Sequence, residues 1–508
     1  MMKTINVLTA ALAWASASAV AAPIHPWLAD SPWAMAHGDP YQSDAVEGPG
    51  PLSAQDLGAP QFVYTGPINI NLLMSPVYPD GQRVWWGNDV LQVYKVGLVN
   101  GKLTKLKTLS KGPIIQSGFI AARTPTSGAY TLLLRDNIYV TVRGNTFYAF
   151  EDTDKTSRNS PIRLKQQMTL SADVLTTDDA IVGLNLLWDG NIAFASRRGI
   201  VGVVSQDFQR VHSLKLSGSP KEEVSNSIAA DEQGGVYVVS SEAMYRVQWT
   251  GNSISLAPST GAWRASYDVG GEPVAGRHTK GSGTTPTLMG VNGHRLVTIA
   301  DGAKLGKVVV FWRDAIPSDW QPIGPGKDLR IAGEAAIDYG QPERAISQTE
   351  QSLVGSGYGV AAVSNDYQNV AVASQAANAI SPIAHNLMNG LIQLGSAIPK
   401  VQPWGMQKFE WDPHARKLNS VWSRTDVSCP NAIPTMSQTS NRFYCVGAHD
   451  GKWTIEGVNW TTGQQHFRKY LGVLPRYNSF YSATQLNGDG SMIYGSVDGV
   501  VYLPAAPR

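Results

Sequence analysis

Oxygen-bearing side chains recur where successive strand-like segments of the chain begin, and these residue types could hold a ligand. The segments open on Asp178 and Asp179, Asn226 and Ser227, Thr284, Thr285 and Thr287, Glu350 and Ser352, Asn431 and Thr435, and Ser482. Carboxylate and amide oxygens are ligands that Ca²⁺ prefers, and the same acceptors and hydroxyls suit a polar organic ligand. The alternative for each Asn, Ser or Thr is a bond to nearby backbone. We take Asp179, Asn226, Thr285, Glu350 and Asn431 as candidate ligand-binding residues.

Two residues are candidates for catalysis. Glu350 is a carboxylate inside TEQSLVGSGYG, away from any evident surface turn. His278 lies in a Gly-rich loop with Arg277 and Lys280 beside it, so it could bind an anion or transfer a proton. A solvated loop histidine is the alternative. The nine histidines show no metal-binding spacing, and the sequence contains no HExxH, GxSxG or Walker A motif.

A fold that gathers these distant residues is indicated by the strand pattern. Residues 224–251 contain three short strands with β-branched, alternating composition, separated by turns at 231–235 and 241–242. The pattern recurs with a period of about 45 residues, which is typical of a four-stranded propeller blade. The units cover about 69–109, 128–170, 174–216, 224–251, 283–323, 350–422, 431–471 and 482–504. We therefore predict an all-β propeller of four-stranded antiparallel blades, eight in number, with seven as the alternative.

Three further segments complete the predicted domain, which covers residues 61–508. The last unit lacks an outer strand, and residues 60–65 (PQFVYT) are expected to supply it, because an open sheet edge invites aggregation. Residues 22–60, rich in Pro, Gly and Asp, predict an extended arm laid over the folded body. Residues 366–405 interrupt the sixth unit and are low in charge. They form either a lid over the central channel or a loop that fills a gap between blades.

The first 21 residues have the pattern of a secretory signal peptide, with Lys3, an apolar run over 5–20 and a cleavage site after Ala21. A membrane anchor is the alternative. We therefore expect a periplasmic or secreted protein with no integral membrane segment after cleavage. The formal net charge is +2 and no polybasic run occurs, so nucleic acid is not an expected partner.

The chain has two cysteines, Cys429 and Cys445. In an oxidising compartment two cysteines form a disulfide by default. A hairpin around Ser437 would place them nearly opposite each other. Two free thiols, or a metal site, are the alternatives.

Three segments resemble the blade repeat of the quinoprotein-like β-propeller superfamily: GGVYVVSSEAMYRVQWTG, HDGKWTIEGVNWTTGQQHFRKYLG and GDGSMIYGSVDGVVYL. The resemblance covers most of residues 70–503 and implies an architecture. Dehydrogenases of that superfamily that use pyrroloquinoline quinone (PQQ) carry a disulfide between adjacent cysteines at the cofactor. This chain has no adjacent cysteines, so PQQ is not expected. The chain also resembles calcium-dependent lactonase propellers with a Glu/Asn/Asp metal site, and Glu350, Asn226 and Asp301 are of these types.

These observations favour an exported binding or scaffold protein that recognises a small polar ligand or a protein partner at the central channel face. A calcium-assisted hydrolase of the lactonase or esterase kind is the first alternative. A quinoprotein-like oxidoreductase is the second.

Overall fold

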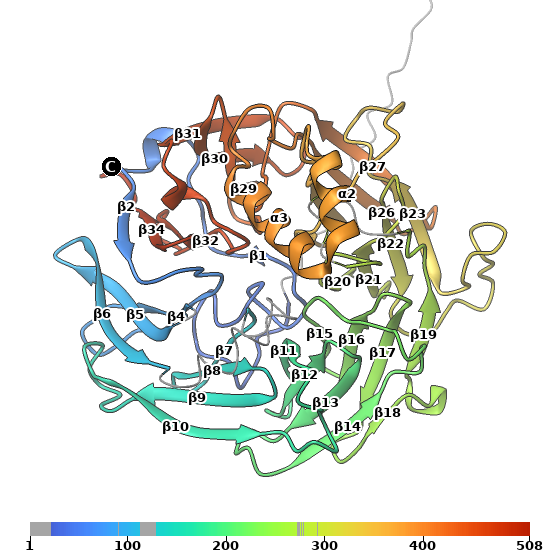
Figure 1. The fold of residues 1–508 in the computed structure, drawn as a ribbon, viewed down its shortest axis with the longest axis horizontal. Coiled ribbons are helices and arrows are strands. Elements are labelled where there is room, and N and C mark those ends of the chain that lie inside the picture. The colour runs from blue at the N-terminus through green and yellow to red at the C-terminus, as the bar shows by residue number, and fades with distance from the viewer. Residues whose placement is uncertain are drawn as a thin grey trace, which may run out of the picture.

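The computed structural model describes residues 22–89, 91–111, 129–271, 275, 277, 279–291 and 293–507. The predicted signal peptide and His278 lie outside these residues. The described chain forms eight sheets arranged in a ring (Figure 1). The fold is therefore a β-propeller with eight blades, and not with seven.

Strands within each blade follow the chain from the axis to the rim (Figure 1). The first four blades are β3 (Leu72–Met74), β4 (Val84–Asn88), β5 (Gln92–Val99) and β6 (Lys102–Ser110); β7 (Leu132–Leu134), β8 (Ile138–Arg143), β9 (Thr146–Asp152) and β10 (Ile162–Thr169); β11 (Ile181–Leu186), β12 (Ile192–Ser196), β13 (Ile200–Val204) and β14 (Val211–Lys215); and β15 (Ala229–Ala230), β16 (Gly235–Val239), β17 (Ala243–Trp249) and β18 (Ile254–Ser255), with β19 (Trp263–Ser266) also on β17. The last four are β20 (Thr287–Met289), β21 (Leu296–Ala300), β22 (Lys307–Trp312) and β23 (Ile331–Ala336); β24 (Val354–Ser356), β25 (Gly359–Val363), β26 (Met406–Asp412) and β27 (Lys417–Arg424); β28 (Thr435–Ser437), β29 (Arg442–His449), β30 (Lys452–Asn459) and β31 (Gln465–Gly472); and β32 (Gln485–Leu486), β33 (Met492–Gly495) and β34 (Gly499–Leu503).

The composition of each strand follows its distance from the axis. β12 (IAFAS) is buried at every residue, because blades on either side cover both its faces. β10 (IRLKQQMT), at the rim, exposes most of its residues. Runs that are apolar throughout thus form inner strands, and mixed runs form outer ones. The core is a series of interfaces between neighbouring blades.

The ring closes where the sequence predicts. β2 (Gln61–Tyr64) pairs antiparallel with β34, and the register runs from Gln61 opposite Tyr502 to Tyr64 opposite Gly499. The expectation that residues 60–65 complete the last blade is confirmed. The eighth blade therefore joins the two ends of the propeller.

The fourth blade differs from its prediction at its inner strand. A strand was expected from Val224, but β15 is only Ala229–Ala230. The Asn226 side-chain amide donates to the Ser282 carbonyl (2.9 Å), and the Ser227 hydroxyl donates to the Leu184 carbonyl (3.2 Å). These residues tie the blade to both its neighbours instead of extending the strand. The outer strand of the fifth blade, β23, also lies beyond the predicted limit at residue 323.

The predicted disulfide between Cys429 and Cys445 is present, with the two Cα atoms 6.0 Å apart. β28 and β29 form the expected hairpin, in which Thr435 pairs with Tyr444. Both cysteines are buried in the seventh blade. The disulfide thus fixes the chain that enters β28 to the strand beside it.

The segment inserted between β25 and β26 contains two helices, α2 (Ala371–Ile380) and α3 (Pro382–Leu394). The Ser381 hydroxyl caps α3 by accepting the Ala384 N–H (3.1 Å), and Pro382 occupies the first turn, where its missing N–H costs nothing. In Figure 1 the helices lie in front of the ring, with α3 reaching toward its centre. Among the described residues no helix is long and apolar enough to cross a membrane.

The middle of the N-terminal arm, about residues 33–46, runs through the middle of the ring, whereas residues 50–58 lie against the seventh and eighth blades nearer the rim (Figure 1). Its carbonyls at Trp33, Tyr41, Ser43 and Asp44 accept the N–H groups of Met74, Leu288, Gly355 and Met436 at 2.8–2.9 Å. β1 (Ala45–Val46) pairs parallel with β28. The arm goes inside because the axial edges of the inner strands offer unpaired backbone groups, which a buried location would otherwise leave unsatisfied.

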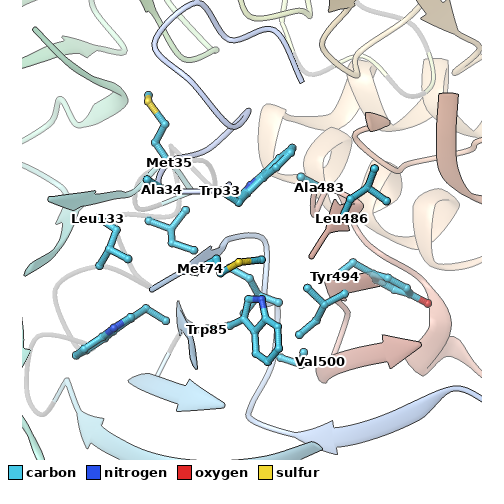
Figure 2. Packing of buried hydrophobic residues seen from close by; sticks show 14 of the residues in the cluster. Trp33, Ala34, Met35, Met74, Trp85, Leu133, Ala483, Leu486, Tyr494 and Val500 are labelled. Carbon is cyan, nitrogen blue, oxygen red and sulfur yellow. The ribbon is translucent and has the colours of Figure 1, made fainter. Parts of the chain in front are cut away.

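Apolar side chains of the arm complete the core at the axis. Trp33 is 1% exposed, and Figure 2 shows it with Met35, Met74 and Leu486, which come from the arm and from the first and last blades. Trp27, nearer the start of the arm, is 37% exposed. The arm is therefore held mainly by its middle.

Candidate functional site at one end of the axis

The openings of several inner strands meet at one end of the axis, and α3 covers them. The Asn431 and Asn478 side-chain amides both donate to the Gln393 carbonyl, at 3.1 and 3.0 Å. His385 Nε2 and the Asn389 amide both donate to the Arg277 carbonyl, at 2.8 and 3.0 Å. The buried face of α3 is therefore polar, with residues 385, 389 and 393 one turn apart.

Glu350 forms an ion pair beneath this helix. Its Oε1 lies 3.3 Å from Arg277 Nε, and the two side chains are 5% and 7% exposed. The Arg277 guanidinium also donates to the carbonyls of Asp301 (3.1 Å) and Gly302 (2.9 Å). A Cβ at Gly283 would lie 2.0 Å from Glu350 Oε1, so only glycine permits this approach. The pair joins the fifth and sixth blades at the axis.

Tyrosines surround Glu350. Burial, with the charges of Tyr367 and Glu350 adding to it, raises the pKa of the Tyr481 hydroxyl. Burial also raises the pKa of the Tyr130 phenol, and the carboxylates of Asp44 and Glu350 add to that shift. Tyr130 thus lies within electrostatic reach of both Glu350 and a second carboxylate that comes from the arm.

Asp44 belongs to a buried pair on the arm that our sequence analysis did not identify. His37 Nδ1 lies 2.7 Å from Asp44 Oδ2, and both side chains are fully buried. The other ring nitrogen, Nε2, faces the Ser352 hydroxyl at 3.5 Å. The Thr285 N–H donates to the same hydroxyl (3.3 Å), and the Tyr130 ring stacks on His37 at 6.0 Å between centroids. We call His37, Asp44, Thr285, Glu350 and Ser352, with Arg277 and Tyr130, the axial site.

The arm is bent into an uncommon backbone conformation at the axial site. His37, Gln42 and Asp44 have φ of 63°, 58° and 53°, in the left-handed region that non-glycine residues rarely adopt. The Asp44 N–H donates to the His37 carbonyl (3.1 Å), which closes the bend. Strain of this kind persists only where the surroundings impose it, and it clusters at functional sites.

Burial raises the pKa values of two carboxyl groups of the arm. It raises the pKa of Asp44 even though His37 opposes the shift. It also raises the pKa of Asp39 to about 6, against the hydrogen bonds from Ser43. The arm thus carries two carboxyl groups whose ionised forms are disfavoured by loss of water.

The residues of the predicted calcium set make separate contacts. Asp301 Oδ2 pairs with Lys307 Nζ (2.7 Å), and burial raises the pKa of Asp301 to about 6. Glu350 pairs with Arg277, and Asn226 donates to Ser282. Within the described ranges no group of three or more His, Cys, Asp or Glu side chains is placed to hold a metal ion. A metal role for this set stays a prediction.

The other sequence candidates divide between the axial site and the blades. Asp179 accepts from the Ser196 hydroxyl (2.7 Å) and the Ala180 N–H (2.7 Å), a turn within the third blade. Asn431 lies under α3. Thr285 lies beside Ser352. The role of His278 stays a prediction, because that residue is outside the described part of the chain.

Several buried polar atoms near the inner-strand openings have no hydrogen-bond partner among the described residues. They are Gln351 Oε1, Asn431 Oδ1, Thr435 Oγ1 and Thr484 Oγ1. Each of these residues is at most 1% exposed. Buried polar groups in folded proteins are almost always satisfied, so a bound ligand is one way in which these atoms could find partners.

Comparisons with known proteins support the architecture. No protein-family model matches the chain. The quinohemoprotein alcohol dehydrogenase of Pseudomonas putida HK5 aligns with a TM-score of 0.52 at 10% identity, over 94% of this chain and 80% of that one. A europium-containing methanol dehydrogenase aligns with a TM-score of 0.53 at 10% identity, over 93% and 98%. At this identity the likeness shows the propeller fold alone.

The cofactor of the quinoprotein dehydrogenases does not fit the residues here. The disulfide joins cysteines 16 residues apart and not adjacent ones. The arm, with Trp33 and Met35 buried, also runs along the axis. We derive no chemistry through a quinone.

A curated relative from the archaeon Archaeoglobus fulgidus, described as an uncharacterized protein, is 37% identical over 476 residues, which cover 93% of this chain and 87% of the relative. Identity at that level over nearly the whole of both chains is a family relationship. The chain therefore belongs to one family with this archaeal protein.

Proposed function

We propose that the chain is an exported binding protein that holds a small, neutral, polar ligand at the axial site beneath α3. The observation that supports the proposal most is the set of buried, unpartnered polar atoms at the inner-strand openings. A ligand with hydroxyl and carbonyl groups would satisfy them. Export is supported by the disulfide, which is typical of oxidising compartments, and by the signal-like first 21 residues.

The charges at the axial site favour a neutral ligand. Glu350 is paired with Arg277, and Asp44 with His37, and all four side chains are almost fully buried. A charged ligand would lose its water and find no free countercharge there, which is costly. Hydroxyls, amides and tyrosines are the groups left to recognise it.

The α2–α3 segment would act as the lid over this ligand. The hydrogen bonds of His385, Asn389 and Gln393 hold α3 over the site. Each such bond contributes only about 1 kcal/mol net, because water replaces it on opening. A lid held by polar contacts can therefore open at a modest cost.

Thermal unfolding with defined probes tests the proposal. We would measure the melting temperature of the wild-type protein with glucose, glucono-δ-lactone and 2-pyrrolidone as neutral probes, and with acetate, succinate and choline as charged ones. A neutral ligand at 100 times its dissociation constant adds about 2.7 kcal/mol of stability. We expect stabilisation by a neutral probe only. Stabilisation by charged probes alone would contradict the proposal.

Two threonines allow a matched control. Thr435→Val removes a hydroxyl that has no partner in the described chain, so the unliganded protein should keep its stability while the ligand effect falls. Thr298→Val removes a hydroxyl that donates to the Val309 carbonyl (3.1 Å) away from the site. Thr298→Val should be less stable than the wild type, but the ligand should still raise its melting temperature by the same amount. If the ligand instead stabilised Thr435→Val fully and Thr298→Val less, the ligand would lie elsewhere.

A protein partner is the second candidate, and the outer face of the helices favours it. Val372, Ile380, Leu387 and Leu391 are 80%, 76%, 66% and 54% exposed. Apolar residues gathered on one surface are typical of an interaction site. We would measure the mass of the protein in solution over a hundredfold concentration range, and compare Leu387→Ser/Leu391→Ser. Association lost in the variant would support a face that binds a second copy.

A further inference from the structure

We propose that the axial site is also a serine hydrolase centre, in which Ser352 is the nucleophile, His37 the general base and Asp44 the carboxylate that orients the histidine. The substrate class is a small neutral ester or lactone. This inference rests on the proposed function, because it assigns chemistry to the ligand of the same site. The proposed reaction uses no metal ion. Of the predicted calcium set, Glu350 lies in the axial site but takes no part in the reaction.

The geometry has the order of contacts that nucleophilic catalysis needs. His37 opposes the effect of burial on Asp44, and where Asp44 is ionised it can only accept, so that the His37 Nδ1–H donates to Asp44 Oδ2 across 2.7 Å. The Nε2 lone pair is then directed at the Ser352 hydroxyl, 3.5 Å away. Such nucleophile–base contacts are often long without substrate and shorten when it binds. Serine, histidine and aspartate centres are recognised by these roles and not by their order in the chain.

The environment of the three residues distinguishes them from an ordinary core hydrogen bond. Ser352, His37 and Asp44 are 6%, 1% and 0% exposed, at the meeting point of the arm and the sixth blade. His37 and Asp44 both have positive φ, so the backbone is held in strain to present this pair. A contact needed only to anchor the arm could be made without strain, as the Trp33 and Tyr41 carbonyls show.

Thr285 supplies the next requirement, a donor for the developing oxyanion. Its N–H donates to Ser352 Oγ (3.3 Å), so this donor lies beside the nucleophile, and in the reaction the oxyanion would replace Ser352 Oγ as its acceptor. Its own hydroxyl is buried and forms a side-chain hydrogen bond with Tyr130. Donors that are fixed before the reaction stabilise the oxyanion without reorganisation.

The reaction balances without any further reagent. Ser352 Oγ forms a bond to the ester carbonyl carbon as its proton moves to His37 Nε2, and the oxyanion faces Thr285. When the C–O bond to the alcohol breaks, Nε2 returns the proton to the leaving oxygen. Water then attacks the carbonyl carbon of the acyl-serine and gives a proton to His37 Nε2. When the bond to Ser352 Oγ breaks, Nε2 passes this proton to Oγ and the carboxylic acid leaves. An ester gives one carboxylic acid and one alcohol, and a lactone gives a single hydroxy acid.

The lid explains why a small substrate is expected. The axial site lies under α3, and the Gln393 carbonyl on that helix accepts from Asn431 and Asn478. Closure would exclude bulk water from the oxyanion, which strengthens each electrostatic contact. A long acyl chain would hold the lid open.

Covalent labelling of the full-length protein tests the inference. We would treat it with a small fluorophosphonate, which bonds to an activated serine, and locate the adduct by peptide mass spectrometry. We expect one adduct, on Ser352, absent in Ser352→Ala and unchanged in Ser356→Ala on the neighbouring strand β24. Asp44→Asn should slow labelling by roughly 100-fold or more. His37→Gln should nearly abolish it.

Activity and folding measurements separate the outcomes. Hydrolysis of p-nitrophenyl acetate should be lost in Ser352→Ala, whereas the melting temperature should fall only modestly because the Thr285 N–H loses its acceptor. If wild-type Ser352 takes no adduct, and the wild type hydrolyses the ester no faster than Ser352→Ala, the inference is overturned. Stabilisation by a neutral probe would then leave the binding proposal standing. Labelling of Ser352 without any such stabilisation would instead support hydrolysis and count against stable binding.

Discussion

His37 Nδ1 lies 2.7 Å from the Asp44 carboxylate in the middle of the propeller, although neither residue belongs to a blade. Both come from the arm that precedes β2 and runs along the inner strands. The blades supply Ser352, Thr285 and Glu350 on the other side of the site. The axial site is therefore assembled only when the arm lies inside the ring, which links the stability of the arm to function.

The arm should contribute strongly to stability through Trp33. Trp33→Ala removes a side chain that is 1% exposed and lies among residues of the first and last blades (Figure 2). We therefore expect the free energy of unfolding to fall by about 3–5 kcal/mol. Trp27→Ala, on the same arm but 37% exposed, is the control and should cost much less. Urea unfolding followed by circular dichroism measures both. Equal effects would show that the arm is not anchored by its middle.

Asp39 should make stability fall as pH rises from about 4 to about 6. Burial raises the pKa of Asp39 in the folded protein to about 6, while the unfolded chain keeps a value near 4. Between these values the folded state binds more protons, so raising the pH removes stability and lowering it restores it. Asp39→Asn should flatten this dependence and stabilise the protein at pH 7.

The measurement is the free energy of unfolding of both proteins at pH 4, 5, 6 and 7. Asp207→Asn provides the control, because hydrogen bonds from Ser205 and Gln209 lower the pKa of this exposed carboxyl. Its substitution should leave the slope between pH 4 and 6 almost unchanged. A wild-type slope that survives Asp39→Asn would assign the effect to other carboxyls, such as Asp301.

The contacts of α3 should control how often the lid opens. His385→Ala with Asn389→Ala removes both donors to the Arg277 carbonyl, and each lost bond costs about 1 kcal/mol. Amide hydrogen exchange in α3 should then accelerate by roughly 30-fold. Leu387→Ala, on the outer face of the helix, should leave exchange nearly unchanged. Equal acceleration in both variants would mean that the contacts with the Arg277 carbonyl do not set the rate.

We predict that Glu350, Asn226 and Asp301 do not together bind one calcium ion per chain, because both carboxylates are in ion pairs. Lys307 and Arg277 would have to be displaced before the two carboxylates could serve as ligands. Elemental mass spectrometry of the purified protein after dialysis against 1 mM CaCl₂ measures this, with Glu350→Gln in parallel. About one calcium per chain, lost in Glu350→Gln, would restore the metal-assisted hydrolase.

The sequence predicts the blades well because each rests on local alternation and turn residues. The disulfide follows from a similarly local hairpin, and the closing strand at residues 60–65 follows from the outer strand that the last unit lacks. The path of the arm could not be predicted, since backbone carbonyls bind it to the inner strands and carbonyls leave no side-chain pattern. His37 and Asp44 were missed for that reason, although Thr285, Glu350 and Ser352 had been placed near the axis.

The most direct test of the axial site is a crystal structure of the protein after treatment with the fluorophosphonate. The account predicts a phosphonyl group on Ser352 Oγ, its oxygen facing the Thr285 N–H, and His37 between Ser352 and Asp44 with the arm inside the ring. A structure in which the arm lies outside the ring, or in which Ser352 is unmodified and His37 points away from it, would contradict the account.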